Sequence, residues 1–193
     1  MNMQELDEAR KNPDFLVFLQ EKENNALKEQ SIKDLYEVLD TLLVLNLEEE
    51  NRINKVYEEI LKIAFNNIEK RIQTNKPLSL DGDDFYYIRS FYEHAIEKWS
   101  LENYDGAKEL FFILTQIIDD QKLIDAFNLH LVNCAKNIDM DKFFDTLVLE
   151  NKDDMDEKYG YFITTFKVNP QEYLGANIDI LKDEFKKMEH LLI

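Results

Sequence analysis

Apolar residues recur every three or four positions along most of this chain, which is the period of an α-helix buried on one face. Residues 51–73 carry the longest such stripe, and two shorter periodic segments, 14–30 and 32–50, precede it. Asn12 and Ser31 stand before these two segments, and both residue types favour the capping position of a helix. The pattern therefore predicts an all-α fold.

Residues 74–85, "TNKPLSLDGDDF", interrupt the periodic pattern with one of the chain's three prolines and one of its four glycines. Leu78 and Leu80 alternate with polar residues, but one isolated short strand has little stability, so we predict a loop. Asp83 or Asp84 is expected to cap the helix that follows. The predicted organisation is an N-terminal helical region at 1–76, a linker at 77–83 and a C-terminal domain at 84–193.

The C-terminal part contains a spaced recurrence. The stretch "YDGA" at 104–107 returns as "YLGA" at 173–176, 69 residues later. The first stretch belongs to a five-position frame of apolar and small residues: Ala95, Trp99, Tyr104, Ala107 and Phe111. A shift of 69 moves this frame onto Thr164, Val168, Tyr173, Ala176 and Ile180, and a shift of 36 moves it onto Leu131, Ala135, Met140, Phe143 and Leu147. The spacing favours a repeat of about three helical hairpins.

The order of large and small residues has a physical reason. Two antiparallel helices approach closely where a small residue on one, such as Ala95 or Ala107, admits a large residue from the other. One hairpin cannot bury its own apolar face, so stacked copies share a core. Asn103, Asp139 and Asn169 stand where the second helix of each copy is expected to begin. An ordinary helical bundle with two coincidental matches remains the alternative.

The order "A-x-x-x-W-x-x-x-x-Y-D-x-A-x-x-x-F" resembles the tetratricopeptide consensus, and it is similar to the first repeat of the class II chaperones of type III secretion systems. Those chaperones are small acidic cytoplasmic proteins with N-terminal helices followed by three repeats. The match is carried by Ala95, Trp99, Tyr104, Asp105, Ala107 and Phe111. The resemblance covers about residues 84–190, and Glu102 replaces a glycine expected before the turn.

The resemblance implies an α-solenoid whose concave groove grips an extended segment of a secreted, hydrophobic, translocator-like protein. The residues expected to face this groove, from their helical positions, are Tyr87, Phe91, His94, Lys98, Asp125, Asn128 and Val132. Plain core packing is the alternative for the aromatic residues among them.

The N-terminal helices suggest self-association. Residues 14–30 carry Phe15, Phe18 and Leu19 on one side and are mostly polar in their second half. A helix of this kind needs a partner surface, so we expect a homodimer through the N-terminal helices.

The net charge limits the classes of partner that the chain is expected to bind. The chain has 40 acidic against 23 Lys and Arg residues, and its formal net charge is −17. Such a field repels nucleic acid phosphates and anionic lipid headgroups, so neither nucleic acid nor a membrane is an expected partner. The polar, acidic start is unlike a signal peptide and no apolar run reaches membrane-spanning length, so we expect a cytoplasmic protein.

Residues that could carry chemistry are few. The three histidines, His94, His130 and His190, are far apart and form no metalloprotease or di-iron motif. Cys134 is the only cysteine and lies in an apolar stripe, which indicates a buried thiol. The acidic runs at 81–84 and 150–160 lack the ligand spacing of a calcium loop. We expect no catalytic, metal or cofactor site.

The sequence therefore predicts a non-enzymatic cytoplasmic chaperone with a tetratricopeptide-like groove. Two alternatives stay open. One is a general tetratricopeptide-like adaptor in a bacterial complex, and the other is a structural helical bundle without true repeats.

Overall fold

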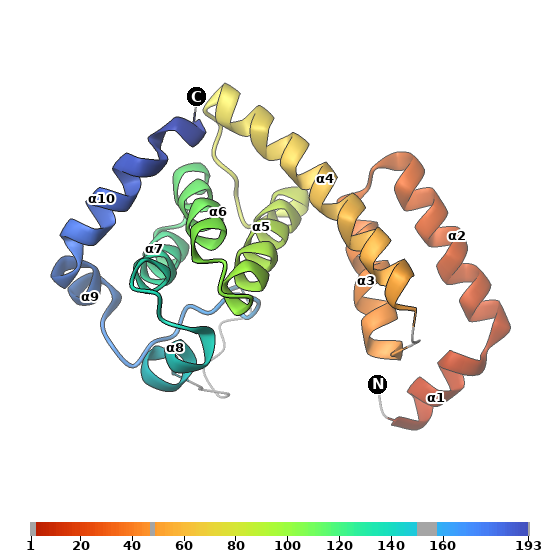
Figure 1. Cartoon of the computed structure of the whole chain (residues 1–193). Helices are drawn as coiled ribbons and strands as arrows, with labels where there is room; N and C mark the ends of the chain where they lie inside the picture. Colours follow the sequence, from red (N-terminus) through yellow and green to blue (C-terminus); the bar gives the residue numbers. More distant parts are fainter. Residues whose placement is uncertain (1–2, 47–48, 150–157, 193) are drawn as a thin grey trace. The chain divides into compact units, whose positions relative to one another are not determined.

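A computed structural model describes residues 3–46, 49–149 and 158–192 (Figure 1). Helices make up most of these residues, and the only β-type pairings within them are two isolated bridges. The prediction of an all-α fold is confirmed. The chain divides into two compact units, Met1–Asn67 and Ile68–Ile193, and helix α4 (Glu50–Thr74) contributes to both.

The first unit contains α1 (Met3–Lys11), α2 (Pro13–Glu29), α3 (Ile32–Leu45) and most of α4. The two predicted helix starts are confirmed: the Asn12 side chain accepts hydrogen bonds from the N–H groups of α2, and Ser31 does so for α3. The buried core of this unit is centred on α3, whose buried residues are Ile32, Leu35, Tyr36, Val38, Leu39, Leu42 and Leu45.

Helix α2 is only partly buried within this unit. Leu19 is buried, whereas Phe18 is 58% exposed and its neighbour Val17 is exposed to the same degree. Glu23 is also buried, because its carboxylate accepts a 2.6 Å hydrogen bond from the Arg52 guanidinium of α4. Dimerisation through this unit remains a prediction.

The second unit contains α5 (Gly82–Ser100), α6 (Tyr104–Ile117), α7 (Gln121–Ala135), α8 (Met140–Leu147), α9 (Pro170–Ala176) and α10 (Ile178–Met188). Helix α6 packs against both α5 and α7 (Figure 1). Asn103, Asp139 and Asn169 each accept a hydrogen bond from the first turn of α6, α8 and α9, so these three predicted helix starts are confirmed.

Four of the five residues of the first frame pack as expected, whereas Tyr104 is half-buried. Ala95, Trp99, Ala107 and Phe111 are fully buried where α5 meets α6. The Trp99 indole N–H also donates a 2.7 Å hydrogen bond to the Ile138 carbonyl, so this side chain reaches the turn between α7 and α8. A buried indole requires such a partner for its donor.

The turn between α5 and α6 shows why a glycine is expected at position 102. Glu102 has a φ of 57°, in the left-handed region that glycine adopts most easily. The left-handed residue lets the chain leave α5 and place Asn103 as the cap of α6.

The other two copies of the frame depart from a repeated hairpin. In the second copy, Leu131 and Phe143 are buried, but α8 is only 8 residues long. In the third copy, Thr164 and Val168 lie outside any helix. Aromatic and β-branched residues are frequent around them, and such residues favour extended chain over helix.

The predicted loop after α4 is held by a backbone hydrogen bond to the end of α6. The Leu78 N–H donates to the Ile117 carbonyl at 2.6 Å, and Leu78 is buried. The cap of α5 corrects our expectation: Asp81 occupies that position without a side-chain hydrogen bond. Asp84 instead accepts from the Ser79 N–H and from Arg71.

The two equivalent alanines of the frame provide a test of core packing. Ala107→Leu should lower the free energy of unfolding by about 1–3 kcal/mol, because the added atoms have no space between α5 and α6. Ala176→Leu, at the exposed equivalent position in α9, should change it by less than about 0.5 kcal/mol. Urea unfolding followed by the fluorescence of Trp99, the only tryptophan, measures both. Equal effects would contradict the packing described here.

Candidate protein-binding site

A non-helical segment lies over α5 and α7. We call residues 158–166 the strap, which is drawn as a light-blue thread in Figure 1. Residues 158–161 form a turn, in which the Phe162 N–H donates to the Tyr159 carbonyl at 2.8 Å, and residues 163–166 continue without a turn. At the end of the strap, Phe166 forms an isolated antiparallel bridge with Val148. The Leu149 N–H donates to the Thr165 carbonyl at 3.1 Å, which continues this pairing. The second half of the strap therefore has the backbone form of a bound extended peptide.

Phe162 is the central anchor of the strap. Its side chain is 5% exposed and lies among three rings, with centroid distances of 5.1 Å to Tyr92, 5.9 Å to Phe85 and 5.9 Å to Phe127. Tyr92 of α5 stacks on Phe127 of α7 at 5.4 Å. These two helices thus form an aromatic pocket that the strap fills.

Phe166 is the second anchor, and it packs against His130 and Phe143. His130 is fully buried; its Nδ1 lies against the Ala126 carbonyl, which makes Nδ1–H the donor, and its Nε2 has no hydrogen-bond partner among the described residues. Burial lowers the pKa of His130 to about 4, although the bond to Ala126 acts in the opposite direction. The imidazole is therefore neutral at pH 7.

Polar contacts hold the first part of the strap. Asp120 caps α7 and accepts 2.8 Å hydrogen bonds from Lys158 Nζ and from the Tyr159 hydroxyl. Burial alone would raise the pKa of Asp120, but these donors, together with the Leu123 N–H, lower it below its ordinary value. An ionised acceptor thus faces the strap at the start of α7.

Helix α5 supplies the remaining polar contacts. The Arg89 guanidinium lies 4.3 Å from the centre of the Tyr161 ring, and the Tyr161 hydroxyl donates to Glu93. The Tyr92 hydroxyl accepts a 3.0 Å hydrogen bond from the Ile163 N–H. A side chain of α5 therefore satisfies a backbone donor of an extended chain, as peptide recognition requires.

The residues predicted from sequence to face a groove lie elsewhere on the same helices. At about 100° per residue, Phe85, Arg89 and Tyr92 lie about half a turn around α5 from Tyr87, Phe91 and His94. The strap-contacting residues were missed for this reason. The signal that could have found the strap is "KYGYFITTF" at 158–166, which is rich in aromatic and β-branched residues.

Three of the predicted groove residues need correction. Phe91 and Val132 are fully buried, so they offer a partner no surface in this conformation. Apolar side chains at these positions are covered by neighbouring elements, which helical position alone does not reveal. Asn128 is also buried, and its Oδ1 has no hydrogen-bond partner within the described chain.

The other four predicted residues keep part of their surface exposed. On α5 these are Tyr87, His94 and Lys98, and the His94 ring pairs with Glu97 at 2.9 Å. On α7, Asp125 accepts a 2.8 Å hydrogen bond from Gln121. The structure does not gather these side chains into one pocket.

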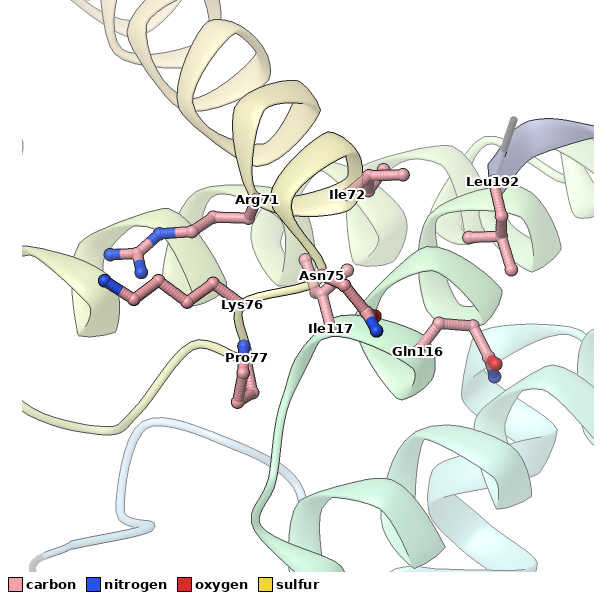
Figure 2. Close-up of a pocket in the computed structure, with 8 residues that line it drawn as sticks. All are labelled: Arg71, Ile72, Asn75, Lys76, Pro77, Gln116, Ile117 and Leu192. Carbon is pink, nitrogen blue, oxygen red and sulfur yellow. The ribbon is translucent and has the colours of Figure 1, made fainter.

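A separate small cavity of about 210 Å³ lies beside the end of α4 (Figure 2). Its volume is below the range of about 300–1,000 Å³ typical of ligand sites. In Figure 2 the Arg71 and Lys76 side chains extend away from Leu192, and the Arg71 guanidinium pairs with Asp84 at 2.6 Å. The lining residues are Arg71, Ile72, Asn75, Lys76, Pro77, Gln116, Ile117 and Leu192.

Other candidate chemistry is sparse in the part of the chain that the structure describes. The thiol of Cys134 is buried, and this burial raises its pKa well above the ordinary value. Within residues 3–46, 49–149 and 158–192, no three His, Cys, Asp or Glu side chains are grouped to hold a metal ion. Among the same residues, no helix has the length and apolar character needed to cross a membrane.

Comparisons of the chain with protein-family models, with curated proteins and with solved structures find no match. The site must therefore be judged from its own geometry.

Acid should weaken the fold through His130. The imidazole has a pKa of 6.5 in the unfolded chain and about 4 in the folded one, so between these pH values only the unfolded chain binds the proton. This contribution to stability is complete above the unfolded pKa and is lost as the pH falls toward 4. Between pH 7 and pH 5 the loss is about 2 kcal/mol. Urea unfolding at both pH values should show this loss, and His130→Gln should remove it, while the same loss in both proteins would contradict it.

The Tyr92 hydroxyl should protect one amide of the strap. Tyr92→Phe leaves the Ile163 N–H without its acceptor, a change of about 1 kcal/mol, so hydrogen exchange at Ile163 should accelerate roughly fivefold. Tyr173→Phe is the matched control, because its hydroxyl bonds Asn133 and not the strap. NMR-detected exchange measures both variants. Unchanged protection in Tyr92→Phe would mean that this bond does not hold the strap.

Proposed function

We propose that this chain is a non-catalytic chaperone whose second unit holds an extended segment of a hydrophobic, secreted protein. The observation that carries the proposal is the strap: a non-helical segment with two aromatic anchors and an extended second half already lies over α5 and α7. Extended segments are recognised through pockets for spaced side chains and acceptors for backbone donors. Phe85, Tyr92 and Phe127 supply such a pocket, and the Tyr92 hydroxyl supplies such an acceptor.

The resemblance to the class II chaperones of type III secretion supports the same function. Its residues Ala95, Trp99, Ala107 and Phe111 form the α5–α6 contact. In this proposal α5–α6 and α7–α8 are tetratricopeptide-like hairpins, and the strap, α9 and α10 follow them in place of a regular third hairpin. The net charge of −17 would keep a complex with an apolar partner in solution.

A catalytic role has less support. His130 and Cys134, two residues of types common in active sites, are both buried in the packed helices. Their pKa values are shifted by burial toward the neutral form, which is expected of packing residues.

Two positions on α5 allow the binding face to be tested. Phe85 contacts the strap, and Tyr87, two residues away, is on the face predicted from sequence. Both are partly exposed aromatic residues, so a photo-crosslinking phenylalanine derivative replaces either with similar disturbance. In the cell from which the gene comes, position 85 should cross-link to one apolar secreted protein, and position 87 should not. Mass spectrometry of the cross-linked product measures this.

Each other result changes the proposal in a defined way. Cross-links from position 87 alone would move binding to the face that contains His94 and Lys98. Cross-links to a set of folded proteins would favour an adaptor in place of a chaperone. No cross-link from either position would contradict protein binding by α5.

A further inference from the structure

We infer that the strap is an internal substitute for the partner, and that a non-helical segment with the same pattern of side chains displaces it from α5 and α7. This inference rests on the proposed function and deepens it. The pattern is a basic residue at the position of Lys158, an aromatic residue four positions later at Phe162, and a second one four further on at Phe166.

The contacts of the strap define this chemistry. The two anchors occupy aromatic surroundings, so apolar rings are required at their positions. Asp120 and Glu93 are the acceptors at the first part of the strap, and both receive donors from it. An acidic segment would meet these carboxylates with like charge. Arg89 and Lys122 lie over the rings of Tyr161 and Tyr159, so the groove favours aromatic side chains along its length and a basic residue beside Asp120.

The strap is packed on one side only. Phe162 is buried toward the helices, whereas Tyr161 is 39% exposed and Thr165 and Lys158 are also exposed. The α5–α6 contact does not use the strap, since Trp99 and Phe111 are buried by the helices and by each other. Ordering nine residues outside any helix has a large entropic cost, and two anchors plus a few hydrogen bonds offset it. Segments of this kind are among the first to open in a native protein.

Displacement leaves the helices with a defined vacant surface. Without Phe162, the rings of Tyr92 and Phe127 would face water and the Ile163 N–H would leave the Tyr92 hydroxyl. A partner with the same anchors would cover these rings again. Because the strap is part of the same chain, it competes at a high effective concentration and lowers the apparent affinity of any partner.

The probe is a fluorescent peptide with the sequence of residues 158–167, tested against the full chain. In Lys158→Ala with Tyr161→Ala, the strap loses the bond from Lys158 to Asp120, the bond from Tyr161 to Glu93 and the contact with Arg89. The bond from Tyr159 to Asp120 and both anchors stay. Anisotropy should show that this variant binds the peptide about tenfold more tightly than the unchanged chain. Lys182→Ala, at an exposed lysine of α10, is the control and should bind like the unchanged chain.

A second peptide and a second variant secure the test. A peptide with alanine at the positions of both phenylalanines should not bind. Tyr161→Ala alone, which removes an exposed side chain, serves if Trp99 fluorescence shows the double variant to be unfolded. Peptide bound to the single variant should also accelerate hydrogen exchange at Ile163 of the protein, because the strap has left the groove.

Three results would overturn the inference. One is the absence of peptide binding to the folded variants, and another is binding that leaves exchange at Ile163 unchanged. The third is a variant that binds no peptide but is a dimer when measured by light scattering, because a second copy of the chain would then occupy the groove. If a partner cross-links to position 85 but the peptide does not bind, the proposed function stands and only the inference about the strap is wrong. If the peptide binds but no partner cross-links, the strap is displaceable and the proposed function is wrong.

Discussion

The second unit depends on one cluster of aromatic rings. Trp99 of α5 lies 4.7 Å from Phe143 of α8, 5.8 Å from His130 of α7 and 6.1 Å from Phe111 of α6, between ring centres. Four helices therefore share one side chain, whose indole N–H is also satisfied by the Ile138 carbonyl. Large planar rings bury much area with few torsions to fix, so such a cluster stabilises short helices that could not persist alone.

The same cluster continues into the candidate site. Tyr92 contacts Phe111 on the core side and Phe162 of the strap on the other. His130 likewise lies between core rings and Phe166. The surface that would receive a partner is thus the outer layer of the core itself, and its rings are positioned by helix packing. A groove built in this way is largely preorganised, which reduces the entropic cost of binding.

Both units expose apolar side chains. In the first, Val17, Phe18, Leu43 and Val44 are exposed, and in the second Leu101, Leu149 and Ile178 are. In the second unit, the surface that would receive an extended segment is already covered by the strap through Phe162. In the first unit, the exposed apolar residues are what self-association through the N-terminal helices would cover.

The sequence by itself determined the features that depend on neighbouring residues. Helix starts at Ser31, Asn103 and Asp139 follow from side chains that bond the next N–H groups, and the close α5–α6 contact follows from Ala95 and Ala107. These interactions span a few residues or one hairpin, so a linear pattern contains them.

Tertiary structure decided which helical faces are covered and where residues 158–166 lie. The strap contacts Phe85 and Tyr92 across about 70 residues of chain, and no local pattern encodes a contact of that range. A slip of one residue turns a helical face by about 100°, and for this reason Phe91 and Val132 were expected at a groove and lie in the core. Periodicity shows that a set of apolar residues shares one face of a helix. Only the packed neighbours determine whether that face meets the core, the strap or water.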